Sequence, residues 1–264
     1  MRRKGKRGIA VVALTVACFL VASIAHAELI ERGDLFVKFD GGIFPTALPR
    51  YTNAPITVSV DGTIKTLSGD RPPALRFIAI AINKGGRIDT KGLPTCRRSQ
   101  IEPATSEQAL EACGAALVGE GRYLGALALP EQSSFPLQGR VLAFNTVIDG
   151  KRAILAHVYG SNPIPNSRIL VFHIHKASGT FGTVLTAELP ARLNRYGYLK
   201  KITLNLHRDF VYRGRKHSYL SAACAAPAGT TLGIFPFVRV SMTFSDGRQL
   251  ASTLTRTCHV KKGR

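Results

Sequence analysis

Three histidines are the residues of this chain whose types and spacing come closest to a catalytic centre. His173 and His175 stand two positions apart in the segment FHIHK, residues 172–176. Neighbouring side chains alternate between the faces of a β-strand, so both imidazoles would project from one face and could bind one metal ion. His157, in a segment that reads as a neighbouring strand, is the candidate third ligand. A metal-dependent hydrolase built on these three residues is therefore one hypothesis.

A simpler interpretation places the two histidines on the wetter face of an ordinary strand. Leu170, Phe172 and Ile174 would then form the core face. No Asp or Glu lies within ten residues of the pair to act as a base or to orient a ligand, and no HExxH helix is present. The pattern favours a solvated strand over a metal site.

Other catalytic patterns are missing from the chain. It contains no Gly-x-Ser-x-Gly motif, no phosphate-cradling glycine loop and no dinucleotide fingerprint. Its carboxylates are scattered, and the pair Glu107 and Glu111 would be solvated on one helical turn. These observations favour a binding or scaffold protein without a cofactor over an enzyme.

The first 27 residues have the layout of a secretory signal peptide. A basic head (2–7) precedes an apolar run (9–24) and the small-x-small sequence Ala25-His26-Ala27, which predicts cleavage after Ala27. A lipoprotein signal ending at Cys18 is the alternative, but the apolar run continues past that cysteine. We expect a secreted or cell-envelope protein with no integral membrane segment after the signal is removed.

Export gives the cysteines a structural meaning. Cys96, Cys113, Cys224 and Cys258 remain after signal removal, and an even number in an oxidising compartment indicates disulfides with three pairings open. Pairing of nearest neighbours, Cys96 with Cys113 and Cys224 with Cys258, is favoured by the internal repeat described below. A zinc site is the alternative, although no C-x-x-C is present.

The chain is strongly basic, with 36 Lys and Arg against 16 Asp and Glu and a formal charge of +20. The excess of positive charge remains after the signal peptide is removed, and it would attract polyanions. An anionic cell-envelope polymer is therefore the expected partner. No specific nucleic acid is implied. The alternatives are a charge that serves only solubility and a purely structural module.

One segment, 206–220, combines cations with aromatic residues. Its sequence LHRDFVYRGRKHSYL predicts a hairpin with Arg213-Gly214 at the tip. Guanidinium groups bind phosphate or carboxylate, and tyrosines can stack on sugars. The predicted anion-binding residues are Arg208, Tyr212, Arg213, Arg215, Lys216 and Tyr219. The alternative interpretation is that the cations only keep the turn soluble and that the aromatic residues form ordinary cross-strand pairs.

Most segments alternate with period two, which predicts a mainly β protein. Examples are 56–60, 77–82, 202–206 and 238–244, with turn signals at 61–62, 85–86, 149–150, 213–214 and 246–247. One short helix is expected from Thr105, with Gln108 in capping-box spacing, to Cys113-Gly114.

A weak internal repeat suggests how these strands are organised. Residues 62–66 (GTIKT) are echoed by 182–186 (GTVLT), and each copy leads through an alternating strand to a cysteine. The repeat predicts two tandem immunoglobulin-like β-sandwich domains, 28–130 and 137–260, with a seam at 130–136.

The segments GLPTC (92–96) and ACGAALVGEG (112–121) form a motif around the predicted helix. This motif resembles one in uncharacterised secreted β-rich bacterial proteins. The resemblance implies export and a disulfide, and it carries no activity over to this chain.

Overall fold

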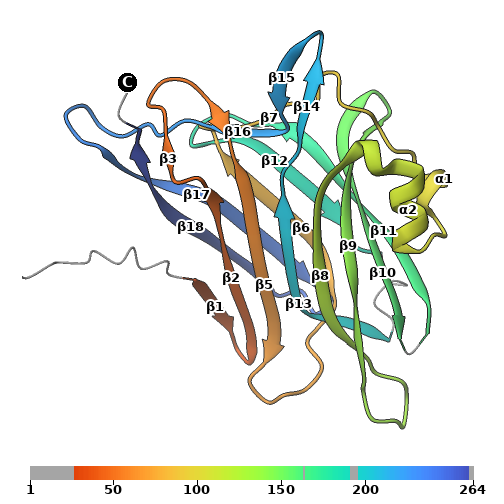
Figure 1. Ribbon diagram of the computed structural model, residues 1–264. Coiled ribbons are helices and arrows are strands. Elements are labelled where there is room, and N and C mark those ends of the chain that lie inside the picture. Colours follow the sequence, from red (N-terminus) through yellow and green to blue (C-terminus); the bar gives the residue numbers. More distant parts are fainter. Residues whose placement is uncertain (1–26, 163, 191–195, 262–264) are drawn as a thin grey trace, which may run out of the picture.

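The computed structural model describes residues 27–162, 164–190 and 196–261, and their fold is mainly β (Figure 1), as predicted. The predicted signal peptide falls outside the described residues up to position 26. The strands predicted at 77–82, 202–206 and 238–244 are present as parts of longer strands, and the one at 56–60 is present from Thr57 onward. Turns also form at Asp149-Gly150 and Arg213-Gly214, where both residues of each pair have positive φ.

Eighteen strands and two α-helices make up the described chain. The strands are β1 (Glu28–Arg32), β2 (Leu35–Phe44), β3 (Ala47–Leu48), β4 (Ala54–Pro55), β5 (Thr57–Thr66), β6 (Leu75–Asn83), β7 (Gly86–Ile88), β8 (Leu117–Leu127), β9 (Phe135–Ile148), β10 (Lys151–Asn162), β11 (Asn166–Lys176), β12 (Phe181–Glu188), β13 (Gly197–Leu206), β14 (Asp209–Tyr212), β15 (Arg215–Ser218), β16 (Leu220–Ala222), β17 (Leu232–Phe244) and β18 (Gln249–Val260).

The predicted helix is α2 (Ser106–Cys113), and its capping box forms as expected. The Gln108 backbone N–H donates to Thr105 Oγ1 over 3.2 Å, and the Thr105 N–H donates to Gln108 Oε1 over 2.9 Å. A second helix, α1 (Arg98–Ile101), was not predicted. Neither helix of the described chain has the length and apolar character needed to cross a bilayer.

Thirteen strands form one curled sheet in the order β1-β2-β5-β13-β8-β9-β10-β11-β12-β6-β17-β18-β3. The sheet curls until its two ends meet, so β1 and β2 approach β18 along a seam. At the seam Arg248 Nη1 donates to Arg32 O over 3.1 Å, and Arg256 Nε donates to Gly41 O over 2.6 Å. Arg256 also pairs with Asp40. Side chains of the last long strand therefore tie the two ends of the sheet together.

The predicted tandem immunoglobulin-like sandwiches are not confirmed, because strands from both halves of the chain pair with one another. β13, from the second half, lies between β5 and β8 of the first, and β6, from the first half, lies between β12 and β17 of the second. The predicted seam at 130–136 falls at the β8–β9 connection, where two neighbouring strands pair directly.

The two halves nevertheless repeat a strand order. The run β2-β5-β13-β8-β9 is matched by β11-β12-β6-β17-β18, with the exchanged strand in the same place. The short sequence echo does not follow this match residue by residue. Ile64 is buried in the interior, whereas in β12 the interior residue is Leu185, one position beyond the aligned Val184. A shift of one residue moves every side chain to the opposite face.

The turn predicted at Asp61-Gly62 is wrong, because both residues lie within β5. Asp61 stands opposite Asp40 on one side and Thr203 on the other. Its carboxylate forms an ion pair with Lys201 Nζ at 3.0 Å on β13. Cross-strand pairing therefore outweighs the local preference of Asp-Gly for a turn.

Apolar side chains form two cores. The larger fills the inside of the curl, and the smaller lies between the helical segment and the outer face of β9, β10 and β11. At one end of the curl, here called the upper end, β4, β16 and β7 form a separate three-stranded sheet, here called the cap sheet (Figure 1). Both predicted disulfides form at this end: Cys96 with Cys113 beside the helices, and Cys224 with Cys258 beneath the cap sheet.

The glycines of the motif at 112–121 allow β8 and β13 to approach closely. A Cβ at Gly121 would lie 1.8 Å from Thr203 O, and one at Gly119 would lie 2.8 Å from Asn205 O. Both contacts are with backbone, which cannot move aside without disturbing the ladder. The exchanged strand β13 can pair with β8 only because these positions lack a side chain.

Gly121→Ala should therefore destabilise the protein by about 3 kcal/mol, because the new methyl group clashes with the backbone of β13. Gly114→Ala is the matched control: its φ is −56° and no atom lies within 4 Å of the added Cβ. The control should change the free energy of unfolding by no more than about 0.5 kcal/mol. Chemical denaturation of the two variants measures the difference, and equal stability would contradict the proposed close approach.

Candidate active surface and cavity

An apolar cavity of about 160 Å³ lies inside the upper half of the curl, beneath the cap sheet. Strands from both halves of the chain line it, including β2, β5, β6, β13 and β17, and β16 and β7 close it from above. Ligand sites in proteins are typically concave, mostly apolar and bounded by a few polar groups. The cavity therefore qualifies as the first candidate binding site.

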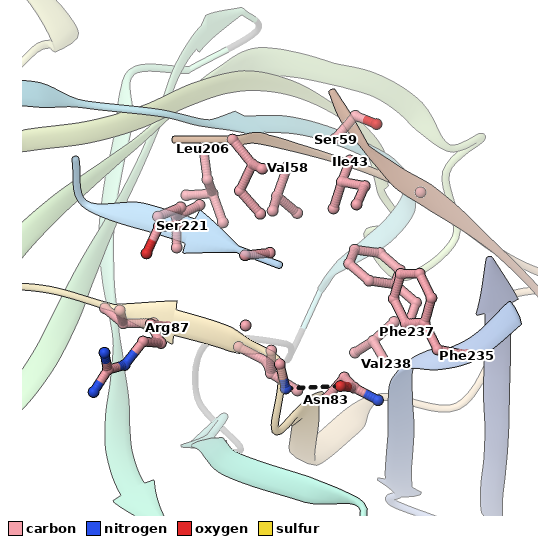
Figure 2. A pocket seen from close by; sticks show the side chains of 18 of the residues that line it. Ile43, Val58, Ser59, Asn83, Arg87, Leu206, Ser221, Phe235, Phe237 and Val238 are labelled. Atoms are coloured by element: carbon pink, nitrogen blue, oxygen red, sulfur yellow. Dashed lines mark hydrogen bonds between the residues drawn. The ribbon is translucent and has the colours of Figure 1, made fainter. Parts of the chain in front are cut away.

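Figure 2 shows two facing walls of this cavity. The side chains that face each other across the space are Ile43, Val58 and Leu206 on one wall and Phe235, Phe237 and Val238 on the other. The hydroxyl of Ser59 and the guanidinium of Arg87 are directed away from it. The labelled walls consequently present hydrocarbon, and Asp40, the other charged residue of the lining, is paired with Arg256.

Asn83, at the edge of the cavity, is held by the surrounding backbone. Its Nδ2 donates to Pro236 O, and its Oδ1 accepts from the Gly85 N–H, both over 2.8 Å. These bonds join the β6–β7 turn to β17. Asn83 thus fixes the position of the cap sheet over the cavity.

Tyr219 is a tyrosine among the residues that line the cavity. Its side chain is fully buried, and within the described chain its hydroxyl has no hydrogen-bond partner. Burial raises the pKa of this phenol well above its ordinary value, so the hydroxyl stays neutral and keeps its proton. A buried unpaired hydroxyl is costly, and this one is covered by protein atoms, so a ligand in the cavity would not reach it.

The predicted hairpin forms as β14 and β15, with Arg213 and Gly214 at the tip. His217 Nδ1 lies 3.2 Å from Asp89 Oδ2. Tyr212 packs over Gly92, where a Cβ would lie 2.1 Å from the Tyr212 ring and φ is +83°. The hairpin is thereby fixed to the segment that leads into the Cys96 disulfide, which explains the glycine of the GLPTC motif.

The structure divides the six predicted anion-binding residues. Arg213, Arg215 and Lys216 are exposed on the hairpin, and none of them has an ion-pair partner among the described residues. Tyr212 lies beneath them, its ring 5.3 Å from the Arg213 guanidinium carbon. Two members are not on this surface: Tyr219 is buried, and Arg208 is half-buried beside Ala115 O. Both follow the strand alternation into the protein, so neither lies on the exposed face of the hairpin.

The three histidines do not share a site. His157 stands opposite Ile169 on β11, four residue pairs from the position of His173, which is about 13 Å along the strand. His157 is fully buried beside the helical segment, whereas His175 is exposed and bonded to Thr186 Oγ1 over 2.9 Å. In the described chain, no group of three or more His, Cys, Asp or Glu is placed to hold a metal ion.

The cavity itself was missed at the sequence level. Its walls consist of the same alternating Ile, Val and Phe residues as the rest of the core. No residue type therefore distinguishes a side chain that lines the cavity from one that packs in the core. Tyr219 gave the nearest signal, since a tyrosine between buried neighbours needs a partner for its hydroxyl. That signal was assigned to the hairpin surface instead.

His157 should make stability depend on pH. Its Nε2 lies 3.0 Å from Ala104 O and must donate to it, which leaves Nδ1 unprotonated, buried and without a partner. Burial lowers the pKa of His157 below its ordinary 6.5. The stability that depends on neutral His157 is thus present above pH 6.5 and lost as the pH falls below it.

The measurement is the melting temperature at pH 7 and pH 5 for the wild-type protein and His157→Gln. The fall in melting temperature from pH 7 to pH 5 should be smaller in the variant, because glutamine cannot take up a proton in this pH range. His175→Gln, at an exposed position, should keep the wild-type drop. An equal drop in all three proteins would contradict the assignment.

Comparison with known proteins finds no match: no family model, no curated protein and no solved structure is similar to this chain. Its function must therefore be inferred from the cavity and the charged residues around it.

Proposed function

We propose that this protein is an exported, non-catalytic binding protein for an anionic amphiphile of the cell envelope. The hydrocarbon part of the ligand occupies the interior cavity, and its anionic group lies against the cations of the upper end. The observation that carries this proposal is the apolar cavity at the upper end, where exposed cations gather around it.

The size and chemistry of the cavity limit the ligand. An apolar cavity of about 160 Å³ stays dry and takes up small apolar groups, because water would find too few hydrogen-bond partners there. It is too small for a whole phospholipid, so a segment of one hydrocarbon chain or a small ring enters.

Charge around the upper end supports an anionic headgroup. Its turns and strand ends carry the exposed cations Lys84, Arg87, Lys151, Lys176, Arg213, Arg215, Lys216 and Lys261. The exposed acids on the turns and strand ends here are fewer, Asp149 and Asp209, whereas at the opposite end Asp34, Asp70, Glu131 and Asp246 offset the exposed Arg32 and Arg71. This asymmetry would orient an approaching anion toward the cavity.

Two disulfides support an oxidising compartment, in agreement with the signal expected from the sequence. By loop length, the Cys96–Cys113 bond should contribute about 3 kcal/mol and the Cys224–Cys258 bond about 4 kcal/mol to stability in the chain-entropy account. The Cys224–Cys258 bond joins two segments that line the cavity, so it would keep the site formed outside the cell.

Filling the cavity should abolish uptake of the hydrocarbon chain. Val58 faces the cavity, and Val58→Phe places a ring in its volume. Affinity for a fluorescent dodecanoic acid, measured by titration, should fall at least tenfold. Val147→Phe makes the same substitution at a residue that is 51% exposed and outside the lining, and it should bind as the wild type does. No uptake by the wild-type protein, or equal affinity in Val58→Phe, would refute the proposed function.

Neutralising the hairpin should weaken binding of the charged group alone. The triple variant Arg213→Gln, Arg215→Gln, Lys216→Gln should bind dodecyl phosphate about fivefold more weakly at low salt, since exposed charge pairs contribute a few tenths of a kcal/mol each. Binding of uncharged dodecanol should be unchanged.

The control triple Lys38→Gln, Lys65→Gln, Lys200→Gln removes the same charge from exposed positions on β2, β5 and β13. It should leave dodecyl phosphate affinity within about twofold of wild type, because screening limits the reach of distant charges. Equal losses in both triples would show that net charge, and not the hairpin, attracts the anion.

A further inference from the structure

Four large apolar side chains are exposed together at one corner of the upper end. Phe44 is 73% exposed, Tyr51 89%, Leu232 43% and Ile234 70%. We call these four residues the rim patch. Single exposed apolar residues are ordinary on protein surfaces, whereas a group of large ones indicates a surface that meets an apolar partner.

Strand pairing brings the rim patch together. Leu232 stands opposite His259 on β18, and His259 in turn stands opposite Ala47 on β3, three residues after Phe44. Arg50 Nη1, next to Tyr51, donates to Pro227 O over 2.9 Å in the segment that leads to Leu232. The patch therefore joins β2, β3 and β17 across the upper end of β18.

The rim patch adjoins both the cavity and exposed cations. Ile234 borders the cavity while remaining largely exposed, so the two meet at this residue. Lys261 directly follows β18, and Lys84 directly follows β6, the strand on the other side of β17. Apolar side chains flanked by cations match a lipid surface that carries negative headgroups.

We propose that the rim patch docks this protein onto an anionic lipid bilayer, with its apolar side chains inserted among the headgroups and Lys84 and Lys261 against the phosphates. The evidence for the docking surface is the exposed patch and the charges beside it. We infer that docking lets a hydrocarbon chain pass from the bilayer into the cavity without crossing water, and this purpose rests on the proposed function.

Vesicle flotation tests the docking surface. Wild-type protein should float with vesicles of phosphatidylglycerol and phosphatidylcholine, bind at least tenfold more weakly to phosphatidylcholine alone, and be released by high salt. Phe44→Ser with Ile234→Ser should reduce partitioning at least tenfold. The matched control, Leu67→Ser with Leu124→Ser, removes two side chains of 62% and 47% exposure elsewhere and should float as the wild type does.

Circular dichroism of both double variants establishes that they are folded, and gel filtration reports the oligomeric state. No flotation of the wild type, or equal losses in the two double variants, would overturn the proposal. So would a wild-type dimer that Phe44→Ser with Ile234→Ser converts to a monomer without changing flotation, because the patch would then bind a second copy of the chain.

Val58→Phe separates docking from ligand binding. This variant keeps the rim patch and should float as the wild type does. Flotation of wild-type protein that takes up no dodecanoic acid would leave the docking surface standing and refute the proposed function. Uptake of dodecanoic acid without flotation would refute the docking surface and leave the proposed function standing.

Discussion

The exchange of one strand between the halves of the chain is the constraint on which the rest of the structure depends. β13 completes the run of strands begun by the first half, and β6 completes that of the second. Neither half could therefore fold as a sandwich of its own without exposing the gap that the exchanged strand fills. The cavity depends on this exchange, because its walls come from both halves of the chain and exist only when the whole sheet has formed.

The upper end carries the connections that give the cavity its boundary. Cys224 leaves the cap sheet and is bonded to Cys258 on β18, while Asn83 bonds β17 from the turn before β7. The lining thus combines regular strands, which set its width, with crosslinked segments that close it. A preformed site loses less conformational freedom when a ligand binds, so rigid closure favours affinity.

Sequence reasoning succeeded where the signal is local. The alternating strands, the capped helix at Thr105 and the Arg213-Gly214 turn each depend on a few neighbouring residues, and all are present. The order of strands depends on contacts far apart in the chain, and alternation is the same whichever partner a strand chooses. Asp61-Gly62 shows the limit in one place, since the pairing with Lys201 cannot be read from the segment itself. The cavity was beyond reach for the same reason, because a lining isoleucine and a packed one have identical neighbours in sequence.

The two charged residues of the cavity lining do not offer a free charge to its interior: Asp40 is paired with Arg256, and the Arg87 guanidinium is directed away. A carboxylate or phosphate would therefore lose its hydration inside this mainly apolar cavity without a replacement. A purely anionic polymer would therefore remain on the outside, held weakly by exposed cations that salt screens. A plain hydrocarbon would enter but gain nothing from those cations. Only a molecule with both parts, joined over the distance from the lining to the surface, uses the two features together, and that is the physical case for an amphiphile.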